Sequence, residues 1–102
     1  MIWRVHGVPL TQPVSFKTML QRGNRIQLPK VVRWRYKLEQ NQLLRVSLTA
    51  VGFFCGWEAF CARMDKSGRV TVPKLTLALL RSQISGKPDL TGAVMDVLLE
   101  PV

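Results

Sequence analysis

Hydrophobic and polar residues alternate along several short stretches of the chain, as in strands that bury one face and expose the other. In the stretch from 42 to 48, for example, Leu44, Val46 and Leu48 share one face. Most of these stretches end near Gly, Pro or Asn, residues that favour turns. We expect strands over seven ranges: 1–10, 14–20, 25–28, 42–48, 57–64, 69–72 and 94–99.

Two helices are expected, over 29–36 and 73–81, each directly after a strand and each with its proline in the first turn. Proline suits that position because its missing N–H would have no partner there. In the first helix we expect Val32 and Tyr36 to face inward and Lys30, Arg33 and Lys37 to face solvent. The second helix is more apolar all round, which predicts deeper burial.

The stretch Arg25-Ile26-Gln27-Leu28-Pro29-Lys30 has a second copy, Arg69-Val70-Thr71-Val72-Pro73-Lys74, 44 positions later. Each copy follows a turn signal, at 22–24 and at 65–68, and each precedes an expected helix. A pattern that recurs with matching flanks indicates internal repetition. We therefore expect one domain, 1–102, built from two strand-strand-helix-strand units over about 14–48 and 57–99. The apolar residues 49–56 between them predict a buried connection.

The chain carries a formal charge of +9, and that charge is unevenly distributed. Residues 1–50 hold nine Lys and Arg against one Glu, a balance of +8, whereas residues 51–102 hold six basic and five acidic residues, a balance of +1. Concentrated positive charge favours polyanions such as DNA or RNA. A solvated surface that only maintains solubility is the alternative interpretation.

The candidate chemistry of the chain is sparse. Cys55, Cys61 and His6 are too few for a structural zinc site, which takes four ligands. Both cysteines are expected to be small buried hydrophobic residues, with a disulfide as the alternative. No paired carboxylates, nucleophile with a base, or phosphate-binding glycine loop is present, so we expect no enzyme and no cofactor. The longest uncharged run, 46–57, is too short to span a membrane, and we expect a soluble, cytoplasmic protein without a membrane partner.

The two motif copies resemble the AbrB/MraZ family of swapped-hairpin proteins. The range 65–74 resembles the core motif of that family closely, and 17–48 more loosely, with Asn24 in place of the motif glycine. The resemblance implies a mainly β fold with short helices, a closed cradle-loop β-barrel of two tandem β-β-α-β units. MraZ-like proteins carry both units in one chain, whereas AbrB-like chains interleave in pairs, and both arrangements remain open.

The resemblance also implies DNA as the partner and transcriptional regulation as the function, through basic residues of the hairpins. Helical charge next to the motif adds Arg33 to the set. The candidate nucleic-acid-binding residues are Lys17, Arg22, Arg25, Lys30, Arg33, Arg63, Lys66, Arg69 and Lys74.

Two alternatives remain open. One is a non-enzymatic barrel that binds a protein or forms a homo-oligomer through the apolar second helix and the stretch 51–54. The other is a substrate-binding or enzyme-associated barrel whose loops, including 82–89, line a pocket. Trp3, Trp34 and Trp57 are aromatic residues that stack on bases in some proteins and pack in cores or interfaces in most.

Overall fold

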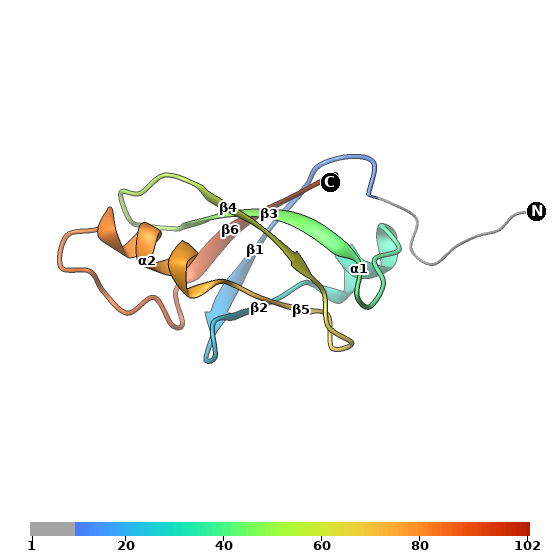
Figure 1. Ribbon diagram of the computed structural model, residues 1–102, viewed down its shortest axis with the longest axis horizontal. Helices are drawn as coiled ribbons and strands as arrows, with labels where there is room; N and C mark the ends of the chain where they lie inside the picture. The colour runs from blue at the N-terminus through green and yellow to red at the C-terminus, as the bar shows by residue number, and fades with distance from the viewer. Residues whose placement is uncertain (1–9) are drawn as a thin grey trace, which may run out of the picture.

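This computed structural model describes residues 10–102 of the chain, which form six strands and two helices (Figure 1). The elements are β1 (Val14–Gln21), β2 (Arg25–Gln27), α1 (Lys30–Arg35), β3 (Leu43–Ala50), β4 (Glu58–Arg63), β5 (Arg69–Thr71), α2 (Lys74–Ser82) and β6 (Val94–Glu100). The order strand, strand, helix, strand thus occurs twice along the chain. The strand expected over 1–10 lies outside the described residues, apart from Leu10, which is not in a strand.

The six strands form one antiparallel sheet in the order β4-β3-β6-β1-β2-β5. The two edge strands, β4 and β5, are consecutive in the chain and meet at the turn 65–68, where the Asp65 N–H donates to the Arg69 carbonyl at 2.9 Å. The sheet is therefore a nearly closed barrel. The prediction of a mainly β barrel with short helices is confirmed.

Most of the strand pairing joins the first half of the chain to the second. Only the β1–β2 ladder lies within a half, whereas the ladders β1–β6, β2–β5, β3–β4 and β3–β6 all cross between halves. The two halves are therefore interleaved in one barrel around a shared core.

The core lies inside the barrel and is formed by the inward-facing apolar residues that alternate with outward-facing ones along each strand. Val46 and Leu48 of β3, for example, are fully buried, as are Val97 and Leu99 of β6. From α2, Thr76, Leu77 and Leu80 are buried against the barrel, whereas α1 has no fully buried residue. The helix α2 therefore covers its end of the barrel more tightly than α1 covers the other.

The pairing of β2 with β5 places the two motif copies side by side. Ile26 pairs with Val70, its counterpart in the other copy, and Arg25 pairs with Thr71 while Gln27 pairs with Arg69. Two further hydrogen bonds match in the same way: the Leu28 N–H donates to the Gly68 carbonyl at 2.9 Å and the Val72 N–H to the Asn24 carbonyl at 2.7 Å. The motif copies are thus related by an approximate two-fold axis through the Ile26–Val70 pair.

The structure corrects the expected helix starts and confirms the deeper burial of the second helix. Pro29 and Pro73 occupy the N-cap positions with ψ of 141° and 144°, so each helix begins at the following lysine and not at the proline. The second helix is buried more deeply than the first, although Leu75 and Leu79 lie on an exposed face. Its one buried face suffices, since the barrel contacts it from one side only.

The connection between the halves also differs from the prediction. Val51, Phe53 and Phe54 are exposed, and Phe54 is 98% accessible. The chain turns at Gly52, with φ of +87°, and passes outside the barrel end instead of through the core. Cys55 is half-buried and Cys61 exposed, both as free thiols, so neither is the fully buried residue expected.

Candidate nucleic-acid interface

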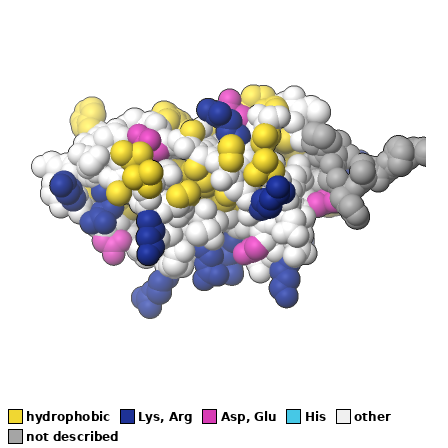
Figure 2. Space-filling view, in the orientation of Figure 1, with side chains coloured by type: hydrophobic (Ala, Val, Ile, Leu, Met, Phe, Trp, Pro, Cys, Tyr) yellow, Lys and Arg dark blue, Asp and Glu magenta, His cyan; other side chains and the backbone are white. Residues whose placement is uncertain are grey.

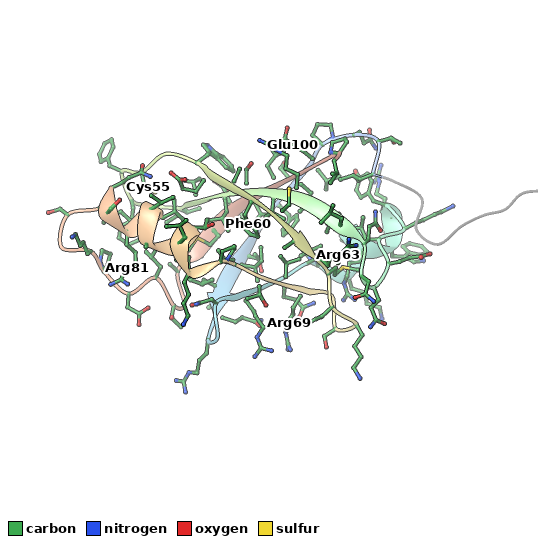
Figure 3. The ribbon with its side chains drawn as sticks, viewed as in Figure 1. Cys55, Phe60, Arg63, Arg69, Arg81 and Glu100 are labelled. Atoms are coloured by element: carbon green, nitrogen blue, oxygen red, sulfur yellow. The ribbon has the colours of Figure 1, made fainter. Side chains whose placement is uncertain are left out.

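The paired strands β2 and β5 present the arginines of both motif copies on one surface. Ile26 and Val70 point into the core and are fully buried, so their neighbours Arg25, Gln27 and Arg69 face outward. Because Arg25 is opposite Thr71 and Arg69 is opposite Gln27, the two arginines lie diagonally across the ladder. Figure 3 shows Arg69 on β5 at the lower edge of the barrel.

Two more cations flank these arginines, one from each hairpin turn. Arg22 is exposed in the turn 22–24, and Lys66 is exposed in the turn 65–68. We call the four residues Arg22, Arg25, Lys66 and Arg69 the basic ribbon. Figure 2 shows Lys and Arg side chains projecting along the lower edge of the molecule, where Figure 1 places β2, β5 and their turns.

The turn beneath Lys66 is held by its own Asp65 and by Gln27 of β2. The Asp65 carboxylate accepts the N–H groups of Ser67 at 2.8 Å and Arg69 at 3.0 Å, and the Gln27 amide donates to the Ser67 carbonyl at 2.9 Å. The hydrogen bond from the Arg69 N–H, together with that from Ser67 and the charges of Arg69 and Arg25, lowers the pKa of Asp65 below 3.8 against an opposing effect of desolvation. Asp65 therefore remains charged at neutral pH and offsets one of the four ribbon cations.

Arg33 fills the space between this turn and α1, which corrects the expectation that it faces solvent. It is half-buried, and its Nε donates to the Leu28 carbonyl at 3.1 Å. Its guanidinium lies against Gly68, where an added Cβ would be 2.5 Å from Cζ of Arg33. Gly68 also has φ of +80°, so both the backbone and the arginine require glycine here.

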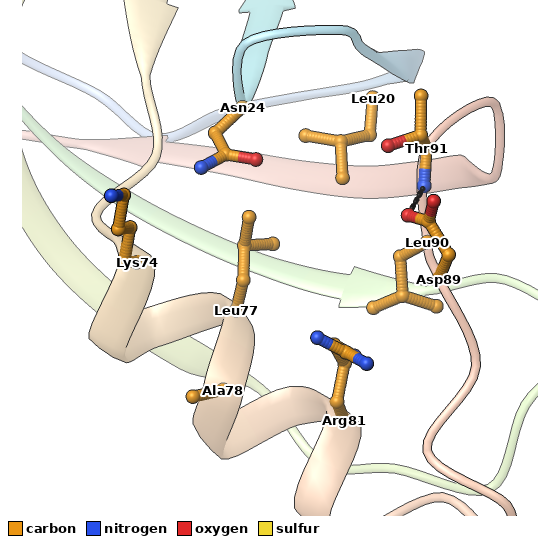
Figure 4. Close-up of a pocket in the computed structure, with 9 residues that line it drawn as sticks. All are labelled: Leu20, Asn24, Lys74, Leu77, Ala78, Arg81, Asp89, Leu90 and Thr91. Carbon is orange, nitrogen blue, oxygen red and sulfur yellow. Dashed lines mark hydrogen bonds between the residues drawn. The ribbon is translucent and has the colours of Figure 1, made fainter.

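The equivalent place at the other end of the ribbon is an open cavity of about 250 Å³ (Figure 4). Leu77 of α2 and Asn24 of the first turn occupy the positions that Arg33 and Gly68 hold at the α1 end. Lys74 and Arg81 line the cavity. Nε of Arg81 donates a hydrogen bond to the Pro88 carbonyl at 2.9 Å, and its Nη2 donates to the Lys87 carbonyl at 3.0 Å. The loop 82–89 expected to line a pocket contributes Asp89 to this cavity.

Asp89 holds its own turn at the cavity wall. Its carboxylate accepts the Thr91 N–H at 3.0 Å. That hydrogen bond, with the Thr91 hydroxyl and the charge of Arg81, lowers the pKa of Asp89 below its ordinary value. The cavity therefore carries cations and one anion around an apolar floor.

A second hollow, shallow and open, lies on α1 and is formed by equivalent positions of the other motif copy. Its volume is about 470 Å³, and its lining residues are Lys30, Arg33, Trp34, Lys37, Leu38 and Glu39. The lysine of each motif copy begins its helix and lines its hollow, and Trp34 occupies the position that Ala78 holds in α2. The two ends of the barrel thus share a framework but differ in side chains.

The nine candidate residues do not form one cluster. Four make the basic ribbon, and Lys30 and Arg33 on α1 and Lys74 on α2 lie at its two ends. Lys17 of β1 forms an ion pair with Asp96 of β6 at 2.5 Å, and Nη1 of Arg63, at the end of β4, donates to the Asn41 carbonyl at 2.8 Å. Lys17 and Arg63 therefore already have partners within the protein.

Sequence reasoning gave no priority to Trp34, which is 80% exposed in the structure. A signal was present: aligning the two motif copies places Trp34 opposite Ala78, so an aromatic residue at this position is not shared by the two copies. Within residues 10–102, no three His, Cys, Asp or Glu side chains gather as metal ligands. The same residues include no helix of the length and apolarity needed to cross a membrane.

Comparison with known proteins gives one informative likeness. Neither a protein-family model nor a curated protein matches the sequence. The fold is similar to the solution structure of PHS018 from Pyrococcus horikoshii, with a TM-score of 0.71, 25% sequence identity and 92% of each chain covered. The likeness supports the barrel architecture over nearly the whole chain and carries no activity with it.

Proposed function

We propose that this protein binds DNA through the basic ribbon and acts as an AbrB-like transcriptional regulator. The observation that carries the proposal is the β2–β5 pairing, which brings Arg25 and Arg69, 44 positions apart in sequence, onto one outward surface. Arg22 and Lys66 extend the positive charge to both turns. Such a row of cations matches the spaced negative charges of a nucleic-acid backbone.

The charge of the ribbon is poorly compensated within the protein. The two ion pairs among residues 10–102, Lys17–Asp96 and Arg45–Glu100, lie on other strands. Asp65 is the acidic group whose pKa the charges of Arg69 and Arg25 lower, and its one negative charge offsets one of the four ribbon cations.

The resemblance of both motif copies to the AbrB/MraZ family supports DNA over other polyanions. Arginine also pairs with phosphate in a fixed bidentate geometry and can read the edge of guanine in the major groove. On this proposal the ribbon arginines contact the duplex, and the turn cations Arg22 and Lys66 contact phosphates on either side.

The test is binding of a labelled mixed-sequence duplex across a salt series, by fluorescence anisotropy. We expect affinity to fall linearly in log salt, and each of Arg25→Gln and Arg69→Gln to reduce the slope by about 1. Arg45→Gln is the matched control, because it removes one exposed positive charge on β3 outside the ribbon. Absence of binding at low salt by the folded parent would contradict the proposal, as would equal effects of all three variants.

A second candidate function, self-association or protein binding, is favoured by exposed apolar side chains at the α2 end. Leu75 and Leu79 of α2 and Phe53, Phe54 and Trp57 of the adjoining loop are exposed. The Gly56 N–H donates to Oε1 of Gln83 at 2.6 Å, which holds this loop against the end of α2. Figure 2 shows hydrophobic side chains over the region of α2 and β4. Oligomers that persist at high salt, without duplex binding, would favour this candidate.

A further inference from the structure

We propose that the hollow on α1 binds an unpaired nucleic-acid base, stacked on Trp34, with the flanking phosphates on Lys30 and Lys37. This inference rests on the proposed function and narrows its ligand to nucleic acid with single-stranded character next to, or in place of, a duplex. Three features of the molecule support it: the exposure of Trp34, the cations around it, and the position of the hollow next to the basic ribbon.

Trp34 contributes little to the core. Its side chain is 80% exposed, whereas Val32 and Tyr36 of the same segment pack against the core. The equivalent position in the other motif copy is Ala78, on a helix that is anchored more deeply. An exposed indole gains no free energy from burial on folding, and it offers a flat face on which any base can stack. The side chain is therefore better explained by a ligand than by folding.

Two lysines line the hollow with the indole. Lys30 lies one helical turn before Trp34, and Lys37 follows the C-cap of α1. Neither lysine has an acidic partner within 4.0 Å among residues 10–102, where the ion pairs are Lys17–Asp96 and Arg45–Glu100. One acidic residue, Glu39, also lines the hollow, so the net charge of the residues that line it remains positive.

Lys37 occupies a backbone position at which glycine is the usual residue. The helix ends with the Leu38 N–H donating to the Arg33 carbonyl at 2.9 Å and the Lys37 N–H to the Trp34 carbonyl at 3.3 Å. This arrangement places the residue after the C-cap in the left-handed region, and Lys37 has φ of +54°. In this conformation the backbone of a lysine is strained and that of a glycine is not. The positive charge at this position therefore comes with a cost in backbone free energy.

The hollow adjoins the basic ribbon. Arg33, which lines the hollow, lies against Gly68 in the same turn as Lys66. A backbone that follows the ribbon therefore reaches α1 without crossing an uncharged surface. Stacking needs a base that has left its partner, because a paired base within a duplex has both faces covered by its neighbours. The combination of indole and lysines thus fits a single strand, not a continuous duplex.

The experiment measures binding of three labelled ligands at one salt concentration: a mixed-sequence single strand, the matched duplex, and an abasic strand of the same length. We expect Trp34→Ala to weaken binding of the single strand by about 5-fold to 150-fold, the range found when one stacked base loses its aromatic partner. Trp34→Ala should leave binding of the abasic strand unchanged. Trp34→Phe should retain most of the affinity for the normal single strand. Trp57→Ala is the matched control, an exposed tryptophan at the opposite end of the barrel.

The outcomes separate this inference from the proposed function. If Trp34→Ala leaves single-strand binding unchanged while Arg25→Gln weakens binding of the duplex, base stacking is wrong and DNA binding by the ribbon stands. If Trp34→Ala weakens the abasic and the normal strand equally, the loss does not come from stacking and the inference is also wrong. If the folded parent binds none of the three ligands at low salt, both proposals fail.

Discussion

The two ends of this barrel are built from copies of the same motif, but one end has a charged surface and the other an apolar one. At one end α1 buries no residue completely and carries Lys30, Arg33 and Arg35. At the other end α2 is longer, buries Thr76, Leu77 and Leu80, and exposes apolar Leu75 and Leu79. One backbone framework therefore supports a charged surface at one end and an apolar one at the other.

The clearest difference lies where each helix faces the opposite hairpin turn. Arg33 fills that space at the α1 end by lying over Gly68, and Leu77 leaves a cavity beside Asn24 at the α2 end. A long cationic side chain can cover backbone and still reach a carbonyl, as Arg33 does with Leu28. The backbone hydrogen bonds at this place are the same at both ends. The side chains of the helices, and not the framework, thus decide what each end can bind.

The largest expected effect comes from removing the anchor of α2. Leu80 is fully buried, so Leu80→Ala should lower the free energy of unfolding by about 2–5 kcal/mol. On α1, Val32 is only half-buried, and Val32→Ala should cost about 1 kcal/mol. Urea denaturation followed by circular dichroism measures both. Equal losses of stability for Leu80→Ala and Val32→Ala would contradict the difference between the two helices. Leu75→Ala, at an exposed position of α2, is the control and should change the free energy of unfolding by less than about 0.5 kcal/mol.

A smaller effect is expected where Arg33 covers the turn. Gly68→Ala introduces both a strained φ and a contact with Arg33, whereas Gly92→Ala, with φ of +86° and no atom within 4 Å of the added Cβ, introduces strain alone. We expect Gly92→Ala to cost about 1 kcal/mol, and Gly68→Ala to cost about 1 kcal/mol more because Arg33 must give up its hydrogen bond to Leu28.

The additional cost of Gly68→Ala over Gly92→Ala should disappear when Gly68→Ala is made together with Arg33→Ala, because the added Cβ then has no Arg33 side chain to contact. A double-mutant cycle by urea denaturation measures this coupling. Strictly additive losses would show that Arg33 does not hold α1 to the turn.

The smallest expected effect is a pH dependence at the same turn. The folded-state pKa of Asp65 is lowered, so its stabilising contribution is present above the unfolded-state pKa of about 4 and is lost as pH falls through the folded value. Asp65→Asn should therefore flatten the loss of stability below about pH 4. Asp89→Asn, at the α2 end, should flatten it less, because Asp89 accepts one backbone N–H and Asp65 accepts two. Denaturation midpoints over this pH range measure both, and an unchanged profile for Asp65→Asn would refute the role given to its carboxylate.

Local patterns predicted the elements of this fold well. Alternation places β1, β3 and β6 within two residues of their observed ends, because a period of two reports directly which face is buried. The proline of each motif copy located the helix starts to within one residue, although it sits at the N-cap and not in the first turn. These features depend on residues close together in sequence.

Features that depend on distant residues were not predictable. The exposure of Phe53 and Phe54 follows from the path of the connection outside the barrel, which an apolar composition does not reveal. The diagonal placement of Arg25 and Arg69 requires the β2–β5 register, and the contact of Arg33 with Gly68 requires the helix to meet the opposite turn. Motif position predicts the candidate residues other than Arg33, but it cannot show that Lys17 pairs with Asp96 of β6 or that Arg63 donates to the Asn41 carbonyl.

The interleaving of the two halves has a consequence for how the chain folds. Since four of the five strand ladders join one half to the other, neither half can complete its sheet alone. No part of the barrel is thus a folding unit by itself, and unfolding is expected in a single cooperative transition. Pairing over such sequence distances also means that loop closure precedes most of the stabilising contacts, which makes folding slow for a chain of this length. A chain cut within 51–57 would then regain structure only when both fragments were present together.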